Sequence, residues 1–381
     1  MKVLVTGGAG FIGSHTVDLL LQRGYAVRVL DNLQPQVHPR GKPAWVSPEV
    51  EFLTGSVTDR EALSRALEGI EAVYHLAAYQ DYLPDFSTFL HTNAESAALL
   101  FELIVARRLP VRKLVFASSQ SVCGEGRYRC LQDGVVYPDP RPLAQLERGD
   151  WEIQCPRCRR YMDPLRIDEA TANPGTAYGI SKYAIELLAA RLGRRYRIPA
   201  VCMRYTYVQG PRNSFYNAYS GIARRFALQI MHQLPPVIYE DGRQQRDYVH
   251  VQDVARANVL VLEREEADFE VYNVGGGHAV TVLEYAQIML KAFGSDLHPL
   301  IPGEFRLGDT RHTVSDISKL QRLGWAPTVP VETTVAEYAQ WIREQRVSRE
   351  YLDAAERVMR EQGVVRAARI GDGPGSRRIM A

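Results

Sequence analysis

The N-terminal half of the chain alternates between short apolar runs and stretches whose apolar residues recur at helical spacing. The first run, Lys2-Val3-Leu4-Val5-Thr6, is rich in β-branched residues and typical of a buried parallel strand. Phe11 to Gln22 follows as a helix that ends near Gly24. We expect further strands at Ala26–Leu30, Val50–Leu53, Ala72–His75, Lys113–Ala117 and Ala200–Met203, and helices at Asp59–Leu67 and Asn93–Ala106. This alternation predicts an α/β protein with a doubly wound parallel sheet, which binds ligands at the carboxyl ends of its strands.

Length and composition exclude several classes of protein. The 381 residues, 46% of them hydrophobic, can bury a large core and favour two domains, or one domain with a lobe. The 46 basic and 44 acidic residues nearly balance, which does not indicate nucleic acid or an anionic membrane as a partner. No apolar run reaches the roughly 18 residues of a membrane span, and the N-terminus lacks the order of a signal peptide. Five cysteines fit a reducing cytoplasm better than a disulfide framework, so we expect a cytoplasmic protein.

A glycine-rich turn follows the first strand directly. Gly7, Gly10 and Gly13 have the spacing G-x-x-G-x-x-G and lead into the first helix. Such a turn brings backbone N–H groups and the positive helix N-terminus to a pyrophosphate. Asp31 stands at the end of the second strand, where a carboxylate accepts hydrogen bonds from ribose hydroxyls and repels a 2′-phosphate. The pattern predicts a dinucleotide site that prefers NAD to NADP.

Two later strand ends and one residue pair carry candidate chemistry. His75-Leu76-Ala77-Ala78 puts small residues where a nicotinamide could lie, or is a plain turn. Ser118-Ser119 places hydroxyls at the mouth of the sheet, although serines after a strand are often turn formers. Tyr178 and Lys182 are four residues apart, so in a helix they share one face. An ammonium there would lower the phenol pKa from about 10 and make Tyr178 a base, but the spacing alone also fits two unrelated helix residues.

Taken in order, these motifs together with Arg204-Tyr205 resemble the extended short-chain dehydrogenase/reductases, the NAD-dependent nucleotide-sugar epimerases and dehydratases. The resemblance covers about residues 1–345 and implies a Rossmann-like fold. It implies that Tyr178 is the base, that Lys182 lowers its pKa and holds the nicotinamide ribose, and that Ser119 hydrogen-bonds the reacting hydroxyl. The implied cofactor-binding residues are Gly7, Gly10, Phe11, Ile12, Gly13, Asp31, Asn32, Ser56, Val57, Leu76, Ala77, Ala78, Asn93, Tyr178 and Lys182. Ser56 replaces the family's usual acidic residue, but its oxygen can still accept from an adenine amino group.

The two residues after Ser119 discriminate between reactions of this family. The 4,6-dehydratases carry an acidic pair there, because elimination of water needs a separate acid and base. This chain has Gln120 and Ser121. We therefore expect a 4-epimerase, which oxidises carbon 4 transiently and reduces it from the opposite face. A nucleotide-sugar reductase or dehydrogenase, a dehydratase and a non-catalytic NAD-binding scaffold remain as alternatives.

An insertion at about residues 125–170 makes the connection before Tyr178 longer than is usual in the family. Cys155-Pro156-Arg157-Cys158 has the spacing of a zinc knuckle, and Cys130-x-x-Asp133 could supply the other half. The pattern predicts either a structural zinc bound by Cys130, Asp133, Cys155 and Cys158, or reduced thiols in a surface lobe. A similar insertion occurs in the branch that resembles dTDP-L-rhamnose 4-epimerase. A dTDP-deoxysugar such as dTDP-L-rhamnose is therefore the favoured substrate.

The C-terminal part resembles the family's substrate lobe. Arg246 and Arg306 match arginines that grip the substrate diphosphate, a role that suits a fixed guanidinium fork. The stretch from Pro235 to Gly242 resembles the strand that lines the substrate's base, and Tyr207 stands where the family commonly has asparagine. The implied substrate-binding residues are Tyr79, Gln120, Tyr207, Asn217, Val237, Tyr239, Arg246, Arg306 and Asp309.

The expected organisation has three parts. Residues 1–203 form the NAD-binding domain with its insertion, and residues 204–345 form mainly the nucleotide-sugar-binding lobe, with some segments returning to the sheet. Residues 346–381 hold an amphipathic helix over Ser348–Arg369, which could break at Gly363, and a mobile tail. The resemblance also implies a homodimer through the helices that begin near Asn93 and Tyr178.

Overall fold

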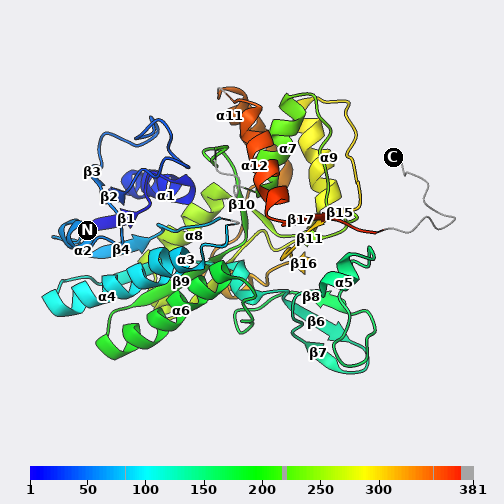
Figure 1. Cartoon of the computed structure of the whole chain (residues 1–381). Helices are drawn as coiled ribbons and strands as arrows, with labels where there is room; N and C mark the ends of the chain where they lie inside the picture. Colours follow the sequence, from blue (N-terminus) through cyan, green and yellow to red (C-terminus); the bar gives the residue numbers. More distant parts are fainter. Residues whose placement is uncertain (82, 217–220, 346, 370–381) are drawn as a thin grey trace.

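A parallel sheet of seven strands forms the centre of the protein (Figure 1). The computed structural model describes residues 1–81, 83–216, 221–345 and 347–369. In spatial order the strands are β13 (Val271–Val274), β9 (Ala200–Tyr205), β5 (Lys113–Ser119), β4 (Ala72–His75), β1 (Lys2–Thr6), β2 (Ala26–Asp31) and β3 (Glu51–Thr54). All neighbouring strands run parallel, which confirms the predicted fold class. β5 and β9 each run two residues beyond their predicted ends, because Ser118 and Ser119 still pair with Arg204 and Tyr205.

Helices cover both faces of this sheet (Figure 1). α1 (Phe11–Gln22) and α8 (Val251–Glu263) pack on one face, where Val17, Leu20 and Val254 join its core. α2 (Arg60–Ala66), α4 (Ser96–Arg107) and α6 (Ala177–Tyr196) cover the other face with their own apolar side chains. Burial on two sides explains why the strands are almost continuously apolar.

The helical stretch predicted at Asn93–Ala106 begins earlier and is irregular. It consists of α3 (Phe86–Phe89), a π-helical segment η1 (Leu90–Glu95) and α4. Asn93 lies within the π-helical segment and is fully buried. π-helical turns often occur where a side chain has a specific task, and Asn93 has one, as described below.

The C-terminal lobe packs three helices around a second core. These are α7 (Gly221–Met231), α9 (Val282–Phe293) and α11 (Val331–Arg343). Short strands link the lobe to the rest of the chain. They are β10 (Tyr207–Gln209) with β12 (Tyr248–His250), and β14 (Val280–Thr281), β11 (Gln245–Arg246) and β16 (His312–Thr313). The remaining short helices are η2 (Gln120–Cys123), η4 (Glu265–Ala267) and α10 (Ser318–Arg322).

The strand expected within residues 235–242 is absent from the described structure. Val237 forms a single bridge with Leu300, and the chain then turns. The Ile238 N–H donates to the Leu300 carbonyl oxygen and the Glu240 N–H to the Glu304 carbonyl oxygen, at 2.8 and 2.7 Å, so the segment pairs at isolated points and not along a continuous ladder.

The insertion forms a small lobe of its own, below the C-terminal lobe in Figure 1. It contains an antiparallel sheet of β6 (Arg127–Cys130), β7 (Gly134–Val136) and β8 (Asp163–Leu165), and one short helix, α5 (Leu143–Leu146). Its core comprises Tyr128, Cys130, Ile153, Cys155 and Met162.

The helix predicted over Ser348–Arg369 breaks near Gly363, as the sequence suggested, and does not continue to Arg369. α12 (Glu350–Glu361) ends, Gly363 adopts a left-handed φ of 64°, and β17 (Val365–Ala367) pairs antiparallel with β15 (Glu304–Arg306). The expected mobile tail falls on residues 370–381, outside the described residues. Within the described chain, no helix combines the length and the apolarity that crossing a bilayer would need.

Candidate active site

The glycine turn is packed too closely for side chains. Gly7 has a φ of 69°, and a Cβ there would lie 2.8 Å from the backbone nitrogen of Ala77. A Cβ on Gly13 would lie 2.1 Å from the carbonyl oxygen of Gly7. Gly10 caps α1 without a side-chain hydrogen bond, and the first turn of α1 holds no acidic residue. The turn therefore leaves a positive helix N-terminus that fits the diphosphate of a dinucleotide.

Asp31 fastens this turn to the end of β2. Its Oδ2 atom accepts from the Ala9 N–H at 3.0 Å, and its Oδ1 atom accepts from the Leu33 N–H at 2.9 Å. The indole of Trp45 donates to the Ala9 carbonyl oxygen at 3.1 Å, a contact that the sequence motifs did not indicate. On the next strand end, Ser56 shares a hydrogen bond of 2.8 Å with Thr58. The predicted cofactor residues that follow β1, β2, β3 and β4 thus lie along one edge of the sheet.

Ser119, Tyr178 and Lys182 come together at the carboxyl end of β5. Ser119 ends the strand, and Tyr178 stands in the first turn of α6, where Thr176 accepts from the Gly179 N–H at 3.1 Å. The hydroxyl groups of Ser119 and Tyr178 share a hydrogen bond. The Lys182 ammonium lies 5.7 Å from the centroid of the Tyr178 ring.

The pKa of Tyr178 runs opposite to the sequence prediction. Burial raises the pKa of Tyr178 to about 12, and the hydrogen bond from Ser119 offsets part of this rise. Burial also lowers the pKa of Lys182 to about 8, so the amine is mainly protonated at pH 7. The predicted lowering of the Tyr178 pKa is not seen in the protein by itself, because burial is the largest cause of the shift.

A buried ion pair between Glu186 and Arg204 joins the elements that carry Ser119, Tyr178 and Lys182. Glu186 accepts from Arg204 through both carboxylate oxygens, at 2.8 and 2.7 Å, and from the Ser118 hydroxyl at 2.5 Å. Arg204 also donates to the Thr171 carbonyl oxygen at 2.8 Å. The pair joins β5, α6, β9 and the end of the insertion. Glu186 was not among the predicted residues, although its position one helical turn after Lys182 could have indicated it.

Asn93, a predicted cofactor residue, uses its amide within the protein. Its Oδ1 atom accepts from the Tyr79 N–H at 2.8 Å, and its Nδ2 atom donates to the Tyr79 carbonyl oxygen at 3.1 Å and to Ser181 Oγ at 2.9 Å. The Tyr79 hydroxyl donates to Asp85 at 2.5 Å. Asn93 therefore positions the loop after β4 against α6.

Ser315 links Gln120, the residue after Ser119, to Asp247, the residue after Arg246. Gln120 donates to the Ser315 hydroxyl at 3.0 Å, and the Ser315 N–H donates to Asp247 at 3.1 Å. Ser315 was missed in the sequence, since nothing in its local pattern distinguishes it. The link fixes the carboxyl end of β5 relative to the C-terminal lobe.

Arg246 and Arg306 converge on the segment 306–311. Arg246 is buried, donates to the carbonyl oxygens of Thr310 and Arg311 at 2.8 and 3.0 Å, and lies 5.3 Å from the Tyr207 ring centroid. Arg306 donates from Nε to Asp309 at 2.9 Å. Four predicted substrate residues, Tyr207, Arg246, Arg306 and Asp309, are thus joined through this segment.

The other predicted substrate residues are more scattered. Val237 donates its N–H to Gln229 at 3.2 Å. Tyr239 lies beneath the Arg225 guanidinium, 4.2 Å from its ring centroid, and packs with Met359 and Val365. Asn217 lies outside the described residues.

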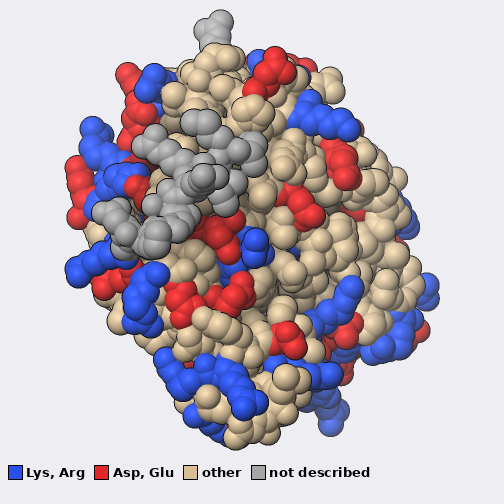
Figure 2. Space-filling view, turned by 90° about the vertical axis from the view of Figure 1, so that its right-hand side faces the viewer, with Lys and Arg blue, Asp and Glu red and all other residues tan. Residues whose placement is uncertain are grey.

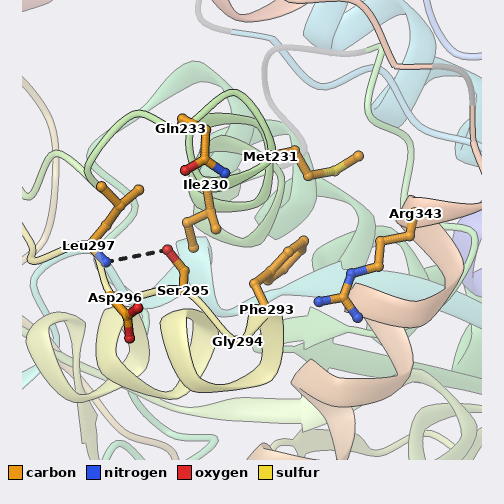
Figure 3. A pocket seen from close by; sticks show the side chains of 9 residues that line it. All are labelled: Ile230, Met231, Gln233, Phe293, Gly294, Ser295, Asp296, Leu297 and Arg343. Carbon is orange, nitrogen blue, oxygen red and sulfur yellow. Dashed lines mark hydrogen bonds between the residues drawn. The ribbon is translucent and has the colours of Figure 1, made fainter.

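A separate cavity of about 490 Å³ opens between α7, α9 and α11 (Figure 3). Ile230, Phe293, Leu297 and Arg343 contribute to its lining, which includes none of the predicted site residues. Among the described residues, its lining holds the Ser295 hydroxyl but no tyrosine and no lysine.

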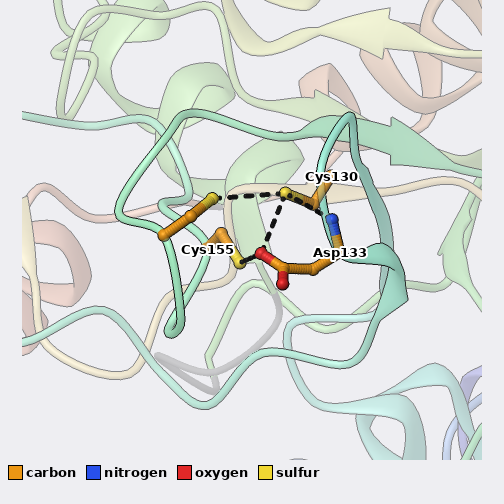
Figure 4. Close-up of side chains that lie close together, drawn as sticks. Cys130, Asp133 and Cys155 are labelled. Atoms are coloured by element: carbon orange, nitrogen blue, oxygen red, sulfur yellow. Dashed lines mark hydrogen bonds between the residues drawn. The ribbon is translucent and has the colours of Figure 1, made fainter.

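The four candidate metal ligands of the insertion also come together. One ligand atom from each of Cys130, Asp133, Cys155 and Cys158 lies within 4.8 Å of the others. Cys130 and Cys155 belong to the core of the insertion lobe, and Figure 4 shows them next to Asp133.

A glycine turn at an open helix N-terminus and a Ser-Tyr-Lys set at the edge of a doubly wound sheet define a dinucleotide-dependent enzyme of the short-chain dehydrogenase/reductase type. The sequence model of the NAD dependent epimerase/dehydratase family matches residues 3–141 and 159–275. The chain belongs to this family, which confirms the predicted relationship. The unmatched residues 142–158 fall inside the insertion.

Individual relatives agree with this assignment. The chain is 33% identical, over 90% of its length and 95% of the relative, to a dTDP-L-rhamnose 4-epimerase of Burkholderia thailandensis. Among solved structures, UDP-glucose 4-epimerase of Thermotoga maritima with UDP-glucose superposes with a TM-score of 0.73 at 30% identity, covering 90% of this chain and 99% of that one. The NAD complex of UDP-glucose 4-epimerase from Thermus thermophilus gives a TM-score of 0.72 at 30% identity and the same coverage.

Proposed function

We propose that the protein is an NAD-dependent nucleotide-sugar 4-epimerase that acts on a dTDP-deoxysugar such as dTDP-L-rhamnose. The observation that carries this proposal is the hydrogen-bonded pair of Ser119 and Tyr178 beside Lys182, followed by Gln120 and Ser121. Together with NAD, the side chains of Ser119, Tyr178 and Lys182 suffice to oxidise one hydroxyl group of the sugar and to reduce it again. The acid and base that a dehydration needs are missing from the two positions after Ser119, and the Gln120 amide is held by Ser315.

The residues present fit NAD. The turn of Gly7, Gly10 and Gly13 would hold its diphosphate at the N-terminus of α1, and Asp31 would accept from a ribose hydroxyl. Lys182 would reach the ribose next to the nicotinamide. Bound NAD supplies a hydride acceptor for the first half of the reaction and a hydride donor for the second.

Tyr178 exchanges a proton with the 4-hydroxyl of the sugar, and Ser119 hydrogen-bonds the same oxygen. When the O–H and C–H bonds at carbon 4 break, the proton goes to Tyr178 and the hydrogen of carbon 4 leaves as hydride. The 4-keto sugar turns about its diphosphate bonds and presents its other face. The hydride then returns to carbon 4 and Tyr178 returns the proton, so atoms and electrons balance without a net change in the cofactor.

The charge of Lys182 favours the transfer of a proton between the sugar hydroxyl and Tyr178. With a pKa of about 12, Tyr178 is neutral at pH 7, so it needs a cation to act as a base. The protonated Lys182 amine next to its ring favours the tyrosinate, and a tyrosinate in turn favours the ammonium. Arg246 and Arg306 would hold the diphosphate during the turn of the sugar.

A substrate labelled with deuterium at carbon 4 tests the reaction class. We expect dTDP-L-rhamnose carrying this label to give its 4-epimer in ordinary water with the deuterium retained, because the hydride returns to the carbon that it left. Loss of the label to solvent would contradict the proposal. A reductase or dehydrogenase, the second candidate, would change the absorbance of the nicotinamide in proportion to product.

The homodimer is also a proposal. Phe86 and Leu90 before α4, and Ile180 and Leu187 on α6, are large apolar residues with exposed side chains. A second copy packed on these helices would remove them from water. Light scattering should give twice the chain mass, and Leu187→Arg should shift it towards one chain.

A further inference from the structure

The insertion carries a cluster of ligands that the sugar chemistry does not use. We propose that Cys130, Asp133, Cys155 and Cys158 bind one structural Zn²⁺ ion. Cys130 and Asp133 come from the turn between β6 and β7, and Cys155 and Cys158 from a second tight turn. Each turn supplies two ligands with two residues between them.

The distances between the ligand atoms are a few tenths of an ångström shorter than those of a tetrahedral zinc site. Zn–S bonds of about 2.3 Å and Zn–O bonds of about 2.1 Å place ligand atoms roughly 3.5 to 3.8 Å apart. The Sγ atoms of Cys130 and Cys158 are 3.4 Å apart. The carboxylate of Asp133 lies 3.4 Å from Cys130 Sγ and 3.2 Å from Cys155 Sγ. A slight expansion of the cluster would admit the ion.

The backbone around the cluster is arranged to orient sulfur ligands. The Asp133 N–H points at Cys130 Sγ, at 3.4 Å. In the second turn, the Arg159 N–H donates to the Cys155 carbonyl oxygen and the Cys155 N–H donates to the Arg160 carbonyl oxygen, at 2.9 and 2.8 Å. The first of these hydrogen bonds would stabilise a thiolate at Cys130, and the other two fix the conformation of the second turn.

The surrounding charge also favours a metal–thiolate centre. Three thiolates and one carboxylate around Zn²⁺ carry a net charge of −2. Arg129, Arg157, Arg159 and Arg160 adjoin the ligands in sequence and are exposed. In Figure 2, Lys and Arg side chains gather at the lower end of the visible face, where Figure 1 places the insertion.

The lobe has only a small apolar core of its own. Its core contains five buried residues, and two of these are the proposed ligands Cys130 and Cys155. Lobes of this size usually need a metal or a disulfide, because they bury too little apolar surface. Cys130, Cys155 and Cys158 form no disulfide in the described structure.

The metal-bearing turn adjoins the contacts between the insertion and the C-terminal lobe. Glu152, three residues before Cys155, accepts from the buried Arg311 at 2.6 Å and lies 3.1 Å from His312 Nε2. Arg141 binds Glu240 and the Asp309 carbonyl oxygen. Zinc would therefore hold Glu152 against the segment that carries Arg306. The effect of zinc on this segment as a substrate-binding element rests on the proposed function, whereas the presence of zinc in the protein does not.

Metal analysis of the full-length protein, purified under reducing conditions without added zinc, tests the proposal directly. We expect about one zinc ion per chain by plasma mass spectrometry. Cys155→Ala and Asp133→Ala should lower the content several-fold, and the matched control Cys202→Ala, outside the cluster, should retain it. If ligand variants fail to fold, cobalt exchange into the wild-type protein should give visible bands of tetrahedral cobalt and thiolate charge transfer.

Three results would overturn the site. They are less than about a tenth of a zinc ion per chain with no cobalt spectrum, equal zinc in Cys155→Ala and Cys202→Ala, and a Cys130–Cys158 disulfide in freshly purified protein. If the proposed function also holds, zinc removal should raise KM for the nucleotide sugar more than it lowers kcat. Zinc present without epimerase activity would leave the site standing and reject the proposed function alone.

Discussion

The Lys182 ammonium lies 5.7 Å from the centroid of the Tyr178 ring and donates to the Ala117 carbonyl oxygen at 2.8 Å. Ala117 belongs to β5, so the sheet itself fixes the position of this cation. Helix α6 supplies both side chains and β5 supplies Ser119. The proposed reactive groups therefore depend on how one helix packs on one strand, and the predictions below test this arrangement.

Replacing Tyr178 by phenylalanine removes the proposed base and little else. We expect Tyr178→Phe to lower kcat by about 10² to 10⁴, the usual contribution of acid–base catalysis, while NAD content stays unchanged. Tyr183→Phe, the same change on the same helix, is the control and should retain activity. Near-normal turnover of Tyr178→Phe, measured by product formation, would reject the assignment.

The buried amine of Lys182 makes stability depend on pH. Its pKa falls from 10.5 to about 8 on folding, which corresponds to roughly 3 kcal/mol. Below pH 8 the amine is protonated in both states, so the folded protein bears the full cost. Between pH 8 and 10.5 the unfolded chain binds more protons, and this cost disappears as the pH rises.

Lys182→Met lacks this titration. The unfolding free energy of the wild type minus that of Lys182→Met should therefore rise by up to about 3 kcal/mol between pH 8 and 10.5. Urea unfolding at several pH values measures it. A difference that stays flat over this range would show that burial does not perturb the amine.

Gly7 and Gly69 have the same φ of 69°, so substitutions at these two positions distinguish the effect of backbone strain from the effect of close packing. Gly69 has open space where a Cβ would lie, whereas at Gly7 a Cβ would meet the Ala77 nitrogen at 2.8 Å. Gly69→Ala should cost about 1 kcal/mol and leave NAD content normal. Gly7→Ala should lose NAD as well as more stability. Equal NAD release on denaturation of the two variants would contradict this account of the turn.

The Glu186–Arg204 pair should be needed for stability. Both side chains are buried, so Arg204→Met leaves an unpaired carboxylate and should cost about 3 to 5 kcal/mol. Arg65→Met, which breaks the exposed pair with Glu61, should cost less than about 1 kcal/mol. Similar urea midpoints for the two variants would refute the role assigned to the buried pair.

The sequence predicted the parts of the fold that depend on local pattern. The strands are visible in the sequence as short apolar runs, and the glycine turn as a fixed spacing of glycines. Tyr178 and Lys182 share a helix face because they are four residues apart. The strand β17 was missed because its partner β15 lies some sixty residues earlier in the chain, and Gly363 is a weak local signal. The raised pKa of Tyr178 was missed because burial depends on tertiary packing, including the ring of Phe89 6.4 Å away.

The central claim is tested most directly by NMR of purified protein incubated with dTDP-L-rhamnose and no added cofactor. The account predicts a second set of sugar H4 signals that grows to an equilibrium mixture of the two 4-epimers, with many turnovers per enzyme and constant nicotinamide absorbance. An absorbance change in step with product, or a keto-deoxy sugar as the product, would contradict it. So would the lack of any conversion of dTDP-, UDP- and GDP-sugars by protein that contains NAD.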